Sequence, residues 1–147
     1  MWPLTPKMSY PDTFLRGLST DDCVSDGIVS SAAFQLHFEP HLLRNGCAAS
    51  SVGWEDDGSV IDVMMRQEKD GEPQFKAGLA RFQRESIDRL MKSPAFARVL
   101  SYDREPLVEN PYHGNLLVSS TATKTQKRLL PGVIATQYSE IIPRLDG

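Results

Sequence analysis

The 147-residue sequence lacks most of the features that mark common protein classes. It has only two cysteines, Cys23 and Cys47, so neither a disulfide scaffold nor a zinc site built from paired thiols is expected. No apolar run is long enough to cross a membrane. Neither G-x-G-x-x-G nor G-x-x-x-x-G-K-[ST] occurs, which argues against the common ATP- or NAD-dependent chemistries. We therefore predict no cofactor and no membrane association.

The beginning of the sequence lacks the apolar stretch and the small-residue cleavage site of a secretory signal. With two thiols and no signal, we expect a cytoplasmic protein whose cysteines stay reduced. Its size and composition are typical of a small bacterial protein. Prolines and turn-forming residues predict a loose arm over residues 1–13, followed by a single domain over residues 14–147, and Met8 is an alternative start to Met1.

The balance of residue types is that of an ordinary globular domain. Apolar residues make up 40% of the chain and charged residues 24%, enough to bury a core without disulfides or metals. The net charge of −3 argues against a general nucleic-acid binder, which needs a surplus of cations facing the phosphates. A local basic patch stays open as an alternative.

Apolar periodicity predicts an α+β fold: an antiparallel sheet of four to five strands, about three helices packed on one face, and a long C-terminal helix. Residues 12–17 fit a short strand or a helical turn, and residues 95–102 fit either equally well. We expect the first two clear strands to pair with each other. Alternation predicts strands over residues 28–39, 48–54, 73–82 and 115–119, and helical spacing predicts helices over residues 59–69, 84–93 and 123–142.

One histidine lies in a turn-like context, in the stretch "NPYHGNLLV". Proline, asparagine and glycine flank His113, and Tyr112 and Asn115 are close enough in sequence to form one local hydrogen-bonding group with it. Three interpretations are open. The ring caps a backbone carbonyl in the turn, contacts a partner chain, or serves as a general base.

Two charged clusters are candidate binding surfaces. Glu55, Asp56 and Asp57, together with the acidic loop at residues 21–26, would suit a basic partner or a hard cation, but they also fit a solvated helix N-terminus. Cations near the start of the last predicted helix oppose its dipole, so they either bind an anion or pair with surface carboxylates. These cations are Lys124, Lys127 and Arg128.

A metal site is not predicted. His37 and His41 stand four residues apart, but Pro40 interrupts any helix between them, and zinc sites need three or four ligands. We predict a small protein-interaction module, such as a subunit, an adaptor or an immunity-like inhibitor, that binds a protein partner through charged loops. A small homo-oligomer is compatible with this prediction. The alternative is a cofactor-independent hydrolase or transferase that uses His113 with Arg16, His37 or Glu39.

Overall fold

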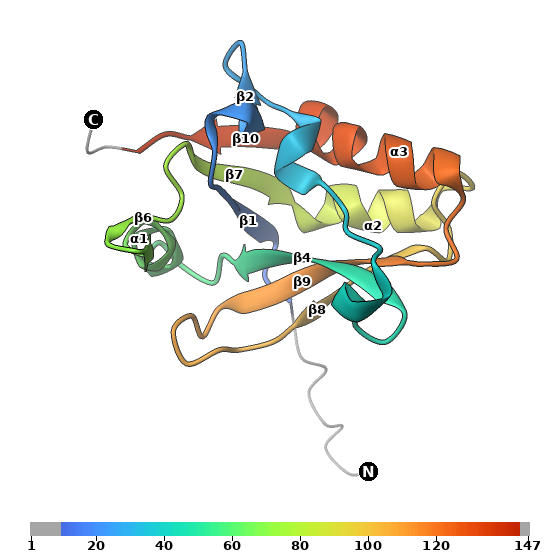
Figure 1. Ribbon diagram of the computed structural model, residues 1–147, viewed down its shortest axis with the longest axis horizontal. Coiled ribbons are helices and arrows are strands. Elements are labelled where there is room, and N and C mark those ends of the chain that lie inside the picture. The colour runs from blue at the N-terminus through green and yellow to red at the C-terminus, as the bar shows by residue number, and fades with distance from the viewer. Residues whose placement is uncertain (1–9, 145–147) are drawn as a thin grey trace, which may run out of the picture.

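The computed structural model describes residues 10–144, and within them the main sheet has six strands. All neighbouring pairs are antiparallel, in the order β10-β7-β1-β4-β9-β8 (Figure 1). The predicted α+β class is confirmed, with one more strand than expected. The strands of this sheet are β1 (Thr13–Leu18), β4 (Cys47–Trp54), β7 (Gly78–Gln83), β8 (Leu100–Arg104), β9 (His113–Ser119) and β10 (Ser139–Ile142). Two small hairpins pair β2 (Val24–Ser25) with β3 (Ile28–Val29), and β5 (Glu68–Lys69) with β6 (Glu72–Pro73).

Three α-helices accompany the sheet in this part of the chain, and they lie on both of its faces. They are α1 (Ser59–Met65), α2 (Arg84–Lys92) and α3 (Lys124–Gly132). On β1, Phe14 belongs to the apolar cluster that includes residues of α2 and α3, whereas Leu15 packs with Val60 and Met64 of α1. Neighbouring residues of a strand point to opposite faces, so the prediction that all helices cover one face is wrong. None of the helices within residues 10–144 meets the length and apolarity that a membrane span requires.

An aromatic cluster fills the larger of the two apolar cores. Trp54 and Phe14 are fully buried, with ring centroids 4.1 Å apart. The Tyr10 ring lies tilted against Trp54, with ring centroids 4.8 Å apart, so the described end of the predicted N-terminal arm contacts the core. The rest of that arm, residues 1–9, lies outside the described residues.

The strand predicted over residues 28–39 is largely wrong. Only Ile28–Val29 pairs, as β3, and Ser31–Phe34 then turns as a 3-10 helix. The alternating residues after it, Gln35–Glu39, join no strand. The expected pairing of this segment with β4 is also wrong, because β4 pairs with β1 and β9. Phe34 is nevertheless buried. The alternation of apolar residues therefore reflects burial of one side of this segment, although the segment forms no β-sheet hydrogen bonds within residues 10–144.

The predicted C-terminal helix is present but shorter than expected. Helix α3 ends at Gly132, a π-helical turn covers Val133–Gln137, and the chain then extends into β10. Ile141 of β10 pairs opposite Ala80 of β7, so this apolar residue belongs to a strand rather than to a helix. The ambiguous residues 95–102 lead into β8, and the predicted elements at β4, α1, α2 and β9 are confirmed with small shifts at their ends.

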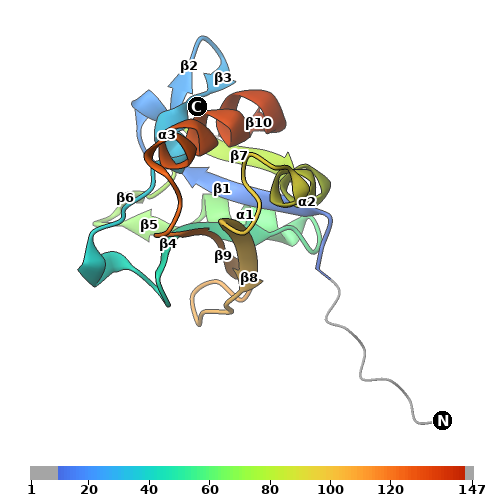
Figure 2. The same cartoon turned by 90° about the vertical axis from the view of Figure 1, so that its right-hand side faces the viewer.

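The main sheet is nearly split into two three-stranded halves. Strand β1 pairs with β7 at six positions and β4 pairs with β9 at seven, but β1 and β4 pair only at Phe14↔Trp54 and Leu15↔Gly53. Figures 1 and 2 show β10, β7 and β1 on one side of this joint and β4, β9 and β8 on the other. The two halves therefore separate beyond Leu15, at the place where the next residue of β1 is arginine.

Candidate functional site

Arg16 occupies the place where β1 and β4 separate. Its Nε donates to the carbonyl of Ala33 at 2.9 Å, and its Nη1 donates to the carbonyl of Ser51 on β4 at 2.6 Å. The side chain of Arg16, rather than the β1 backbone, thus joins the two halves of the sheet here. Both acceptors are neutral backbone groups.

Arg16 has no carboxylate partner within residues 10–144. Its Nη2 has no hydrogen-bond acceptor there, although no fully buried side-chain nitrogen or oxygen in this range lacks a partner. Nη2 is therefore open to solvent rather than sealed in the protein. Burial lowers the pKa of Arg16, because removal from water disfavours the charged form. The guanidinium stays protonated and carries a positive charge that the protein only partly solvates.

A cleft of about 760 Å³ opens beside Arg16. Its walls come from four parts of the chain: the β1–β4 joint, the end of α1 with β5, residues 74–75, and the β8–β9 loop. The ring of Phe75 lies against Gly17, where an added Cβ would be only 2.0 Å from the ring. The side chains that matter most for chemistry here are Arg16, Ser51, Arg66, Gln74, Phe75 and His113.

His113 lies in this cleft, at the first position of β9. Its Nδ1 donates to the carbonyl of Glu105 at 3.0 Å, which leaves Nε2 of the neutral ring as the acceptor. The ring therefore caps a backbone carbonyl and also lines the cleft. Tyr112 contacts Ser59 through its hydroxyl at 3.1 Å, and Asn115 donates to Asp103 at 2.9 Å. Within the described chain no hydrogen bond joins Tyr112, His113 and Asn115 to one another.

The other residues of the predicted enzyme site are only partly brought together. Arg16 lines both the cleft and a smaller hollow of about 240 Å³, and exposed His37 lines that hollow alone. Glu39 is exposed and lines neither space. Ser51 and His113 share the cleft without a hydrogen bond between them in the described structure, so no nucleophile–base pair is formed there.

Glu55 and Asp56 of the predicted acidic cluster pair with arginines, whereas the aspartates of its loop at residues 21–26 make no ion pair within residues 10–144. Glu55 forms a two-pronged ion pair with Arg81, with distances of 2.7 and 3.0 Å, and Asp56 pairs with Arg104 at 2.9 Å. Hydrogen bonds from the hydroxyl and backbone N–H of Ser59 lower the pKa of Asp57. Two of the three carboxylates are therefore already matched by cations, and the third caps the start of α1.

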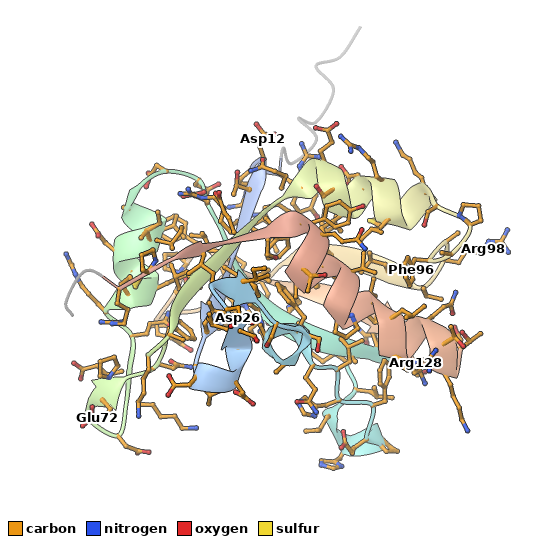
Figure 3. All side chains as sticks on the ribbon, turned by 90° about the horizontal axis from the view of Figure 1, so that it is seen from above. Asp12, Asp26, Glu72, Phe96, Arg98 and Arg128 are labelled. Carbon is orange, nitrogen blue, oxygen red and sulfur yellow. The ribbon has the colours of Figure 1, made fainter. Side chains whose placement is uncertain are left out.

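The cations of the predicted basic cluster, in contrast, have no ion-pair partners in the described part of the chain. These cations are Lys124, Lys127 and Arg128. The Nζ of Lys127 lies 4.2 Å from the centre of the Phe38 ring, a cation–π distance. Figure 3 looks onto α3 and shows Arg128 at the outer surface of the molecule.

Several cleft residues were not foreseen from the sequence. Ser51, Arg66, Gln74 and Phe75 come from separate elements, and no spacing in the chain signals that they meet. Arg16 did carry a signal, since a cation inside the apolar strand "TFLRGL" points into the protein at a cost unless something binds it.

Comparison with known proteins does not extend this assignment. The chain matches no protein family, no curated protein and no solved structure. Within residues 10–144, no group of three or more histidine, cysteine, aspartate or glutamate side chains is placed to hold a metal ion. The candidate site is therefore defined by its geometry, with Arg16 at its centre.

Proposed function

We propose that this protein binds a small organic anion, bearing a carboxylate or phosphate group, in the cleft between β1 and β4. The single observation that carries the proposal is the half-buried guanidinium of Arg16, which has two carbonyl acceptors and no carboxylate. A cation removed from water is stabilised strongly by an anion that enters the same space. Arg16 is held by both carbonyls, so its remaining N–H groups need little reorganisation to bind one.

The rest of the cleft indicates the kind of anion. Phe75 and Met64 offer apolar surface for the body of the ligand, and Gln74 and Asn110 offer amide groups. Exposed Arg66 adds a second positive charge, whereas Glu68 and Glu109 line the same cleft and repel long polyanions. A compact ligand with one anionic end and one apolar end fits this distribution best.

A binding role is better supported than the hydrolase or transferase alternative. Catalysis by His113 would need a reacting group within reach of Nε2, and the described chain supplies no activated nucleophile beside it. His113 can still accept a hydrogen bond from a ligand through Nε2. The protein-interaction hypothesis invokes other surfaces, namely the acidic cluster with the loop at residues 21–26 and the basic start of α3, none of which lines this cleft.

The experiment is isothermal titration with benzoate as the probe and neutral benzamide as its isostere. We expect saturable benzoate binding, with benzamide weaker by at least about tenfold, the ratio given by one charge-assisted hydrogen bond of about 1.5–3 kcal/mol. Arg16→Gln should abolish the preference for the anion. Arg16→Lys should abolish most of it too, because an ammonium group lacks the planar fork that reaches two carbonyls and a ligand together.

Arg89→Gln is the matched control, since Arg89 is an exposed arginine on α2 whose only ion pair within residues 10–144 is to Glu85. It removes the same charge from the molecule and should bind benzoate like the parent chain. Circular dichroism would confirm that each variant is folded. Equal binding of benzoate and benzamide, or undiminished binding by folded Arg16→Gln, would refute the proposal.

A further inference from the structure

The segment Gln35–Glu39 pairs with no strand within residues 10–144. Its end residues have backbone dihedral angles of φ −56°, ψ 135° and φ −58°, ψ 131°, near the polyproline II region. The backbone groups of Leu36, His37 and Phe38 make no hydrogen bond within residues 10–144. Backbone groups that the protein leaves unpaired are hydrated, and they can pair with an incoming extended chain.

A groove of about 590 Å³ lies between this segment and α3. Its apolar side chains are Leu36, Phe38 and Pro131, and its charged side chains are Lys124, Lys127 and Arg128. No carboxylate lines the groove. The overall net charge is −3, so this gathering of cations is a local property and not a reflection of composition.

Arg128 differs from five other arginines of the described chain, which pair with carboxylates of the protein: Arg44, Arg81, Arg84, Arg89 and Arg104. Lys124, Lys127 and Arg128 have no such partner and lie in the first half of α3, where the helix dipole disfavours positive charge. A partner that brings negative charge to this position would relieve both costs.

We infer that the groove between Gln35–Glu39 and α3 docks an extended, acidic segment of a partner protein. The segment pairs its main chain with Leu36–Phe38, as an added strand does, and its carboxylates face Lys124, Lys127 and Arg128. Apolar side chains on its other edge contact Leu36 and Phe38. Main-chain pairing supplies affinity, and the three cations select an acidic sequence.

The test uses a fluorescent peptide that alternates glutamate and valine, with binding followed by fluorescence polarisation at low and moderate salt. The triple variant Lys124→Glu, Lys127→Glu, Arg128→Glu should lose at least about tenfold in affinity, since each exposed pair contributes up to about 1 kcal/mol. The matched control reverses three exposed lysines elsewhere: Lys69→Glu, Lys76→Glu, Lys92→Glu. It makes the same change in net charge and should bind like the parent chain.

A second peptide, methylated on alternate backbone nitrogens, keeps the charge and removes the donors needed for strand pairing. It should also bind at least about tenfold more weakly. Equal losses of peptide affinity in the two triple variants would show that net charge alone explains the effect, and this would overturn the inference. Undiminished binding of the methylated peptide would overturn the pairing. Tighter binding of a single-stranded DNA of equal charge would assign the groove to nucleic acid instead.

Discussion

Gly114 of β9 pairs opposite Val52 of β4 and Arg104 of β8, and replacing it with alanine should destabilise the fold strongly. A Cβ at this position would be 2.4 Å from the carbonyl oxygen of Asp103 and 2.5 Å from Nε1 of Trp54. Real Cβ atoms do not approach other atoms so closely, so one of the two neighbours must move. The first is backbone of β8, and the second belongs to a fully buried ring packed against Phe14.

The magnitude follows from two effects. Overpacking a well-filled core costs about 1–3 kcal/mol. The same Cβ separates Trp54 Nε1 from its acceptor, the Asp103 carbonyl at 3.0 Å, and an unsatisfied buried donor costs about 1–3 kcal/mol more. The sum, about 2–6 kcal/mol, is a large part of the typical 5–15 kcal/mol that holds a domain folded. Urea unfolding followed by far-UV circular dichroism would measure it as a lower midpoint.

Gly58→Ala is the matched control. Gly58 has φ −63°, which alanine adopts readily, and an added Cβ there meets no atom within 4 Å. Its free energy of unfolding should stay within about 1 kcal/mol of the parent value. If Gly114→Ala unfolded at the parent midpoint, the tight contact between β9, Trp54 and Asp103 would be wrong.

Further predictions concern the cleft, the carboxylate of Glu105 between β8 and β9, and the core. Gly17→Ala should push the Phe75 ring into the cleft, because the new Cβ would lie 2.0 Å from it, and should weaken benzoate binding by about tenfold in titration while unfolding changes little. Hydrogen bonds from Arg44 and then Asn115 lower the pKa of Glu105, so its stabilising effect is complete above the pKa of the unfolded chain and is lost as the pH falls through the folded value. The difference in urea midpoint between the parent and Glu105→Gln should therefore shrink on acidification, and a constant difference would contradict this. Phe34→Ala should cost about 3–5 kcal/mol in the same unfolding assay, since Phe34 is only 2% exposed.

The sequence was sufficient to predict those elements whose hydrophobic pattern fits only one type of secondary structure. Helix α2 is an example: Ile87 and Leu90 stand at helical spacing and are both buried, and the Ser93-Pro94 pair that ends the pattern also ends the helix. Strand β4 was found from its apolar residues, and Val52 and Trp54 lie on one buried face as expected. Local propensity and burial agree at these positions, so the sequence alone predicts these two elements.

The sequence-based prediction was wrong where one hydrophobic pattern fits two types of secondary structure. Phe34, Leu36 and Phe38 alternate like a strand, yet no neighbouring strand is available to pair with them. Ile141 fits the helical stripe of the last segment, but β7 offers an edge that the chain completes as β10. Pairing depends on what lies beside a segment in space, and hydrophobic period does not report that.

The candidate site divides in the same way. The sequence by itself determined the α+β class and the lack of common nucleotide-binding motifs, because composition and period are local properties. Only the tertiary structure decided that β1 and β4 separate after Leu15, that Arg16 fills the gap without a carboxylate, and that His113 and Phe75 line the cleft beside it. These residues lie far apart along the chain and meet through sheet order, which long-range packing sets.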